Sequence, residues 1–285
     1  MCLIALALGQ HPRFPLVIAA NRDEFLHRPA AALGWWHAHP DDAPLLAGRD
    51  LQAGGTWMGL NATGRIALLT NVRDPSRMQA DAPSRGAIVP AWLAARGDAA
   101  AFWHKTVGRG HNPFNLLAGD LIKGDWWWAD DRTHAPQALG PGLYGLSNAA
   151  LDTPWPKVQR LKQALAEALE TAASADELEG QVFAALADRS ATPDAALPDT
   201  GIGLERERWL APAFIRSPDA RYGTRCSTLL IVERADAGEG GFATRAVERQ
   251  FDAQGKPSSQ RRARLGAWPL SGTMQPVQAE ALNAS

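Results

Sequence analysis

The sequence predicts an α+β fold, a four-layer αββα sandwich in which two mostly antiparallel sheets lie between layers of helices. Strand-like segments arrive in consecutive groups and do not alternate one by one with helices, which favours antiparallel sheets. The first two of these segments are apolar on both faces, as expected where both faces of a sheet are covered. Helical segments lie between the groups of strands and can cover the outer faces.

The chain opens with a predicted hairpin. Residues 2–8 and 16–20 are uninterrupted apolar runs, and Gly9, Pro12 and Pro15 separate them. Runs of this kind are typical of fully buried strands. In a hairpin the end of the second strand lies opposite the start of the first, so polar residues that follow the second strand would lie beside residue 2.

The other elements follow from the same patterns. Apolar residues recur every three or four positions over 154–173, which predicts a helix. Shorter helices are expected at 87–95 and 175–187, the latter with Ser174 or Asp176 as its cap. Strands are expected at 66–72, 115–121, 125–129, 144–148, 227–233 and 242–251.

Residues 1–252 are expected to form a single domain. Pro and Gly mark a loop at 190–203, but the strands beyond it are needed to complete the same sheets. From 253 to 285 Gln, Ser and Arg dominate, and we expect a C-terminal extension that is partly ordered.

Composition argues against several classes of partner. Lys and Arg number 29 against 30 Asp and Glu, so no net field would attract nucleic acid or an anionic membrane. No run approaches the roughly 18 apolar residues that an integral membrane segment requires. The two cysteines are too few for a disulfide framework. We expect the opening residues to form a strand and not a signal peptide, and we expect a cytoplasmic location. No His or Cys spacing predicts a metal site.

Cys2 is the sharpest candidate for chemistry. An aminopeptidase that accepts a small second residue could remove Met1 and leave a thiol and a free α-amine on one residue. That amine has an ordinary pKa of about 8 and could act as the base for its own thiol. By position alone, a small buried strand cysteine is the more ordinary interpretation.

Four polar residues, Asn21 to Glu24, directly follow the second predicted strand. Charges are costly there unless they are paired. An arginine beside Cys2 would lower the pKa of the thiol, and an acidic group would hold the α-amine. A salt-bridged strand end is the alternative. Side chains alternate along a strand, so Arg22 and Glu24 should face one side of the sheet. Asn21 and Asp23 should face the other.

Further candidates lie at other strand ends. Asn71 and Asn148 each follow a hydroxyl residue, and their amides could stabilise an oxyanion, although both are also good turn residues. Arg225 could bind a carboxylate or a phosphate. Trp57 and Tyr222 are candidates for contact with a ligand.

Ordered blocks along the chain resemble the NRDE, or transport and Golgi organization 2, family. They are Met1-Cys2, AANRDEF at 19–25, Arg28-Pro29, GRDL at 48–51, GGTW at 54–57, LTNVR at 69–73, SRG at 84–86, FNL at 114–116, GLSN at 145–148, PWPK at 154–157, LPDTG at 197–201 and YGTR at 222–225. The resemblance runs from residue 1 to about 251. It implies the four-layer fold of the N-terminal nucleophile (Ntn) hydrolases.

More distantly, the candidate residues resemble the site of the penicillin V acylase and bile salt hydrolase group. In that group the cysteine attacks an amide, its amine is the base, and asparagines help to hold the oxyanion. The resemblance implies a catalytic set of Cys2, Arg22, Asp23, Asn71, Asn148 and Arg225, with Asn21, Glu24, Trp57 and Tyr222 as ligand contacts. That group spaces its arginine and aspartate more widely, and the NRDE family more often has a hydroxyl residue where this chain has Cys226.

Two functions are compatible with these residues. The first is an Ntn-type cysteine amidohydrolase or thioesterase that needs no cofactor. The second is a trafficking protein that holds haem, acyl-coenzyme A or another lipid in the same cleft, since members of the family are linked to such ligands. In that case Cys2 would be a soft iron ligand or a bystander, and Arg22 or Arg225 would meet propionates or phosphates.

Overall fold

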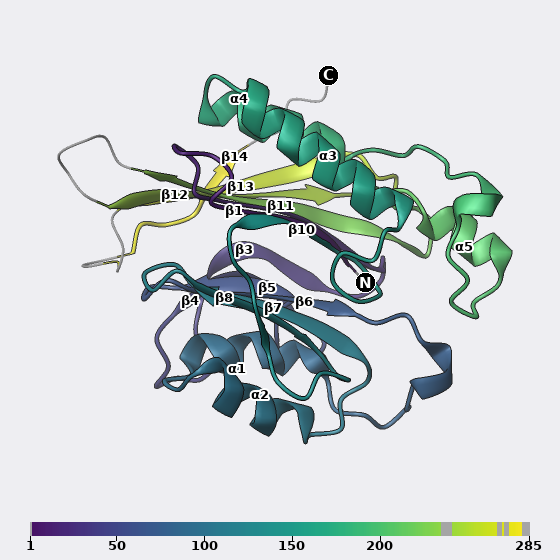
Figure 1. Cartoon of the computed structure of the whole chain (residues 1–285), viewed down its shortest axis with the longest axis horizontal. Helices are drawn as coiled ribbons and strands as arrows, with labels where there is room; N and C mark the ends of the chain where they lie inside the picture. Colours follow the sequence, from purple (N-terminus) through teal and green to yellow (C-terminus); the bar gives the residue numbers. More distant parts are fainter. Residues whose placement is uncertain (1, 235–240, 267–269, 271–273, 281–285) are drawn as a thin grey trace.

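The computed structural model describes residues 2–234, 241–266, 270 and 274–280. Two antiparallel sheets are stacked face to face, and helices cover both outer faces (Figure 1). The first sheet has the order β10-β1-β2-β11-β12-β13-β14, and the second runs from β3 to β9 in sequence order. The predicted αββα arrangement is confirmed.

The first sheet is assembled from both ends of the chain and from one strand near its middle, β10. Its strands are β1 (Cys2–Leu8), β2 (Leu16–Phe25), β10 (Gly142–Leu146), β11 (Tyr222–Arg234), β12 (Phe242–Phe251), β13 (Pro257–Leu265) and β14 (Gln278–Glu280). Helices α3 (Pro156–Thr171) and α4 (Ala175–Leu186) lie on its outer face (Figure 1).

The second sheet comes from the middle of the chain. Its strands are β3 (Ala30–Trp36), β4 (Leu45–Asp50), β5 (Met58–Asn61), β6 (Arg65–Asn71), β7 (Phe114–Asp120), β8 (Asp125–Asp130) and β9 (Gln137–Ala138). Helices α1 (Ile88–Ala94) and α2 (Ala99–Val107) cover its outer face (Figure 1). A fifth helix, α5 (Leu204–Leu210), lies apart from these layers.

The burial of β1 explains its uninterrupted apolar sequence. Ile4 and Leu6 belong to the core between the two sheets. Leu3 and Ala5 point the other way and pack in the core beneath α3 and α4. Both faces of the strand are thus desolvated, which requires apolar residues at every position.

The predicted hairpin is confirmed, with Cys2 paired to Arg22 and Leu8 paired to Leu16. The second strand is longer than predicted, because it continues to Phe25 instead of ending at residue 20. Its extra residues pair with β11, up to the pair of Phe25 with Tyr222. The polar run therefore lies within a strand, because β11 supplies hydrogen bonds past the point where β1 begins.

Several elements were not predicted. These are strands β3, β4, β5, β9, β13 and β14 and helices α2 and α5. Most are short or mix polar and apolar residues, so periodicity does not distinguish them from loops. The last two strands lie in the segment that we expected to be a partly ordered extension, and they add to the edge of the first sheet beside β12.

We expect Leu165→Ala to lower the free energy of unfolding by about 2–5 kcal/mol, since it leaves a cavity in a well-packed core. The Leu165 side chain is fully buried between α3 and the first sheet. Urea unfolding followed by circular dichroism would measure the loss. The control is Leu51→Ala, because Leu51 is 55% exposed and its truncation should change little. Equal effects of the two substitutions would contradict the layered core.

Candidate functional site

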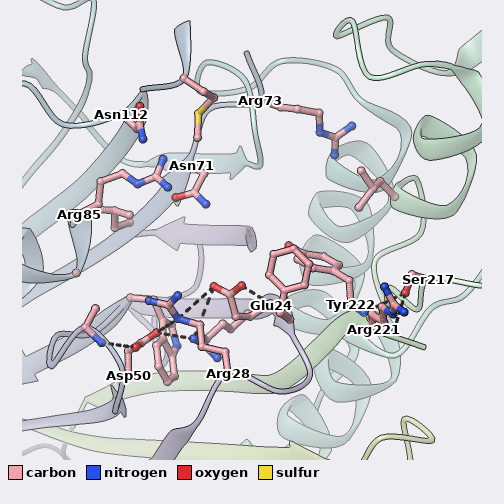
Figure 2. Close-up of a pocket in the computed structure, with 18 of the residues that line it drawn as sticks. Glu24, Arg28, Asp50, Asn71, Arg73, Arg85, Asn112, Ser217, Arg221 and Tyr222 are labelled. Atoms are coloured by element: carbon pink, nitrogen blue, oxygen red, sulfur yellow. Dashed lines mark hydrogen bonds and ion pairs between the residues drawn. The ribbon is translucent and has the colours of Figure 1, made fainter. Parts of the chain in front are cut away.

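A cleft of about 1070 Å³ opens beside the ends of both sheets. Its walls are the last residues of β2, β4 and β6, the first residue of β11, helix α5, and the loops around residues 82–86 and 217–221. In Figure 2, Glu24, Arg28 and Asp50 gather on one side of the cleft, and Asn71 and Arg85 lie on the opposite side.

The polar run in β2 is divided between two environments. Arg22 and Glu24 line the cleft. Asn21 is fully buried on the side of the helices, where its Nδ2 donates to the carbonyl oxygens of Leu186 (2.8 Å) and Ala213 (2.9 Å). Alternation along the strand therefore separates residues for the cleft from residues that anchor the scaffold.

Arg22 is held at the inner end of the cleft. Its Nη2 donates to Asp50 Oδ2 at 3.0 Å, and its guanidinium carbon lies 4.2 Å from the centre of the Trp57 ring. The side chain is 5% exposed. Its Nη1 is buried and has no hydrogen-bond partner among the described residues.

Asp50 is the acceptor for two arginines. Its Oδ2 also accepts a hydrogen bond from Arg28 Nε at 2.6 Å. Burial alone would raise the pKa of the Asp50 carboxyl, but hydrogen bonds from Arg28 and Ala53 and the two arginine charges hold that pKa below 3.8. Glu24 is more loosely placed, with Oε2 3.9 Å from both Arg22 Nη2 and Arg28 Nε.

Cys2 lies on the same cross-strand row as Arg22. The backbone register pairs Arg22 with Cys2 on β1 and with Cys226 on β11. Adjacent strands are about 4.8 Å apart, so the two cysteine Cα atoms are separated by roughly 10 Å. A disulfide requires a Cα–Cα distance of less than about 7 Å, so the two cysteines are too far apart to form one. Cys226 is 1% exposed, and its thiol bonds to Glu248.

Asp23 is fully buried on the opposite side of β2 from Arg22. Its Oδ1 accepts a hydrogen bond from Thr224 Oγ1 at 2.7 Å. Burial raises the pKa of the Asp23 carboxyl, while the charges of Lys157 and Arg73 act against that rise. Lys157 is itself 2% exposed and donates from Nζ to the carbonyl oxygen of Leu210 at 3.0 Å.

The two candidate oxyanion residues are in contact. Asn148 Nδ2 donates to the carbonyl oxygen of Asn71 at 2.8 Å, and the backbone N–H of Arg73 donates to the carbonyl oxygen of Asn148 at 2.8 Å. Asn71 lines the cleft, whereas Asn148 is fully buried behind it. Within the described residues, the Asn71 side chain has no hydrogen-bond partner.

Arg225 supports a turn and is not among the residues that line the cleft. It occupies a β-bulge, where the register of β11 with β2 shifts between Thr224 and Cys226. Its Nη1 donates to the carbonyl oxygens of Phe25, Leu26 and Arg28 at 2.9–3.0 Å. Trp57 and Tyr222 do line the cleft, and the Tyr222 hydroxyl donates to the carbonyl oxygen of Asp23.

Among the charged residues that sequence reasoning did not single out are three that line the cleft, Arg28, Asp50 and Arg73, and a fourth, Glu207, that pairs with Arg73. Arg73 Nη1 lies 2.5 Å from Glu207 Oε2, and both side chains are at most 5% exposed. This pair joins the end of β6 to α5. Three of the four, Arg28, Asp50 and Arg73, lie in blocks of the family resemblance, and this could have marked them as candidates. Their partners, however, come from distant segments of the chain.

Within the described residues, no helix is long and apolar enough to cross a membrane. The same part of the chain has no group of three or more His, Cys, Asp or Glu residues that could hold a metal ion.

Comparison with known proteins identifies close relatives over most of the chain. Residues 1–251 match the family model described as "Transport and Golgi organisation 2". The bovine Transport and Golgi organization protein 2 homolog is 36% identical over 82% of this chain and 89% of its own length. The mouse and human homologs are 35% and 34% identical over the same shares. Among solved structures, a mutant conjugated bile acid hydrolase from Clostridium perfringens is similar, with a TM-score of 0.40 and 9% identity over 99% of this chain and 92% of that one.

Glu248 lies next to Trp57, at the edge of a small second cavity between the sheets. Its Oε1 accepts hydrogen bonds from the backbone N–H of Leu33 (2.7 Å) and from Gln250 Nε2 (2.6 Å). Burial raises the pKa of this carboxyl above its ordinary value of 4.5, and the hydrogen bonds act against that rise. The raised pKa favours the protonated acid.

We therefore expect Glu248→Gln to reduce the pH dependence of stability. Because the folded pKa is raised, the acid stabilises the wild type fully below about pH 4.5, and this contribution is lost as the pH rises through the raised pKa. The loss amounts to about 1.4 kcal/mol for each unit by which the folded pKa exceeds the unfolded one. Urea unfolding between about pH 4.5 and pH 8 would measure it. The control is Glu205→Gln, which changes an exposed carboxyl. Parallel curves for wild type and Glu248→Gln would contradict the assignment.

Proposed function

The chain belongs to the Transport and Golgi organisation 2 family, and from that premise we propose that it is an Ntn-type cysteine hydrolase. It would cleave the acyl bond of a linear amide or thioester, with Cys2 as the N-terminal nucleophile. The observation that carries the proposal is the pairing of Cys2 with Arg22, a cleft residue whose Nη1 is buried and has no partner among the described residues. A thiolate is a natural partner for that nitrogen.

The proposed reaction proceeds in two half-reactions. The α-amine of Cys2 takes the thiol proton, and the sulfur forms a bond to the substrate carbonyl carbon. The tetrahedral intermediate then collapses, and its amine or thiol leaving group departs with the proton from the α-ammonium. Water, deprotonated by the same amine, attacks the resulting acyl thioester. The carboxylic acid is released and the thiol is restored.

Two asparagines would stabilise the oxyanion of each intermediate. The side-chain amide of Asn71 lines the cleft and is available as a donor. Asn148 uses one Nδ2 hydrogen to hold the carbonyl oxygen of Asn71, which leaves it a second hydrogen and keeps the end of β6 in place. Donors that are positioned before the reaction need no reorganisation during it.

Asp23 would hold the α-amine. It is fully buried, and an α-ammonium would add to the positive charges that already oppose the rise in its pKa. Arg225, by contrast, would act through the turn that follows β2, because three backbone carbonyls accept from its Nη1.

We expect Cys2→Ala to abolish hydrolysis of N-acyl p-nitroanilides and acyl thioesters. Alanine is small enough for Met1 to be removed, so processing is retained and only the thiol is lost. Asn71→Ala should lower kcat by about 10²–10³ with little change in KM, as for other oxyanion donors. Intact-mass measurement would check the N-terminus of each protein. Full activity in Cys2→Ala, or active protein that retains Met1, would exclude this function.

A binding role is the second candidate, and the size of the cleft favours it. The volume of about 1070 Å³ is at the upper end for small-molecule pockets and exceeds what a short amide needs. Its outer part combines aromatic Trp209 with Arg206 and Arg221, which suits a large ligand with an apolar body and anionic groups. Haem and acyl-coenzyme A both have this character.

If the cleft binds haem, titration should shift the haem absorption spectrum with saturation at one equivalent. The Cys2→Ala variant tests whether the thiol is a ligand of the iron. An unchanged spectrum in that variant would exclude Cys2 as the axial ligand. A parallel calorimetric titration with acyl-coenzyme A shows which of the two ligands binds. Arg206→Ala should lower the affinity for the ligand that contacts the outer cleft.

A further inference from the structure

We propose that Asp50 is a positioning residue that fixes the Arg22 guanidinium by one terminal nitrogen and so reserves the other, Nη1, for the Cys2 thiolate. The inference deepens the proposed function, because it concerns the residue that would act as nucleophile. It assigns a task to a carboxylate from the second sheet that the reaction scheme does not itself require.

The Asp50 carboxylate is held in one orientation by hydrogen bonds from the turn that follows it. Its Oδ1 accepts the backbone N–H groups of Gln52 (3.1 Å) and Ala53 (2.9 Å). Its backbone N–H donates to the Gly55 carbonyl, and its carbonyl accepts from the Gly54 N–H, both at 2.8 Å. Gly54 has a φ of +76°, a conformation that glycine adopts without strain. Rotation of the carboxylate would break several of these bonds at once.

Arg22 has few other constraints on the rotation of its guanidinium. Trp57 supports one face of the group but would do so equally well after a turn within its plane. The hydrogen bond from Nη2 to Asp50 Oδ2 therefore decides which nitrogen occupies which position. It leaves Nη1 buried and without a partner among the described residues, an arrangement that is costly unless a further group meets it.

Removal of Asp50 would have two opposite effects on the pKa of the Cys2 thiol, one through charge and one through the position of Arg22. Arg28 shares Asp50 Oδ2, Glu24 lies 3.9 Å away, and Arg225 is near enough for its charge to oppose that of Arg22. Removing a carboxylate from this group makes its field more positive, which by itself would favour the thiolate. Loss of positioning would have the opposite effect on the thiol.

The experiment is the rate of alkylation of Cys2 by iodoacetamide as a function of pH, with each cysteine followed by peptide mass mapping. Iodoacetamide is uncharged, so local charge does not steer it. In Asp50→Asn we expect the apparent thiol pKa to rise by about one, and alkylation at slightly acid pH to slow about tenfold. Asp50→Glu keeps the charge but displaces it by one methylene, and should also slow the reaction. Cys226 is buried and should react slowly in every variant.

The control is Glu24→Gln, which removes a nearby carboxylate that makes no hydrogen bond to Arg22, and should leave the rate unchanged or increase it. Circular dichroism establishes that each variant is folded, and Asp50→Glu decides the question if Asp50→Asn is not. A folded Asp50→Asn that reacts as fast as wild type or faster, or an Asp50→Glu that matches wild type, overturns the proposal. Alkylation of Cys2 needs no turnover, so it tests the role of Asp50 independently of hydrolysis. Failure of the proposed hydrolase function would instead appear in the hydrolysis assay, as equal activity of wild type and Cys2→Ala.

Discussion

The contact between Arg22 and Asp50 is the interaction on which the rest of the cleft depends. It joins the two stacked sheets near the point where their strands end, and both groups are almost wholly removed from water. Removing one partner of such a pair costs about 3–5 kcal/mol, because the other charge is left buried without compensation. The pair therefore links the two sheets at the wall of the cleft, which both residues line.

The strand that carries Arg22 has separate tasks on its two faces. On the helix side Asn21 bonds to two backbone carbonyls and Asp23 to Thr224, so this face ties β2 to α4 and β11. On the cleft side Arg22 and Glu24 meet groups from the second sheet and the turn after β2. Three consecutive polar residues, Asn21, Arg22 and Asp23, can therefore be buried, because each face of the strand supplies its own partners.

Close packing around Trp57 sets the shape of the inner cleft. A Cβ at Gly48 would lie 2.5 Å from the Trp57 ring, and one at Gly55 would lie 2.0 Å from the carbonyl oxygen of Gly86. These two glycines allow the ring and the loop around residue 86 to approach the sheet closely. The ring in turn supports the Arg22 guanidinium. The position of the arginine therefore depends on these two glycines as well as on the side chains that contact it.

The sequence by itself determined the layers of the fold and the hairpin that begins it. Apolar residues at every position of β1 require two covered faces, and the heptad-like spacing around Leu161 and Leu165 requires a helix with one buried face. These are local patterns, and each is visible within one element. The split of the polar run between two faces also follows from local geometry, because strand side chains alternate.

Only the tertiary structure decided which charges meet. Asp50 is 28 residues from Arg22, and Glu207 is 134 residues from Arg73, so no periodicity connects either pair. The continuation of β2 to Phe25 likewise depends on β11, whose first residue is Tyr222. The sequence placed Arg225 in the catalytic set, but it could not show that Arg225 Nη1 bonds to backbone carbonyls of the turn after β2, next to a bulge in β11. Local patterns specify elements, whereas a site is made of contacts between elements, and those depend on how the sheets stack.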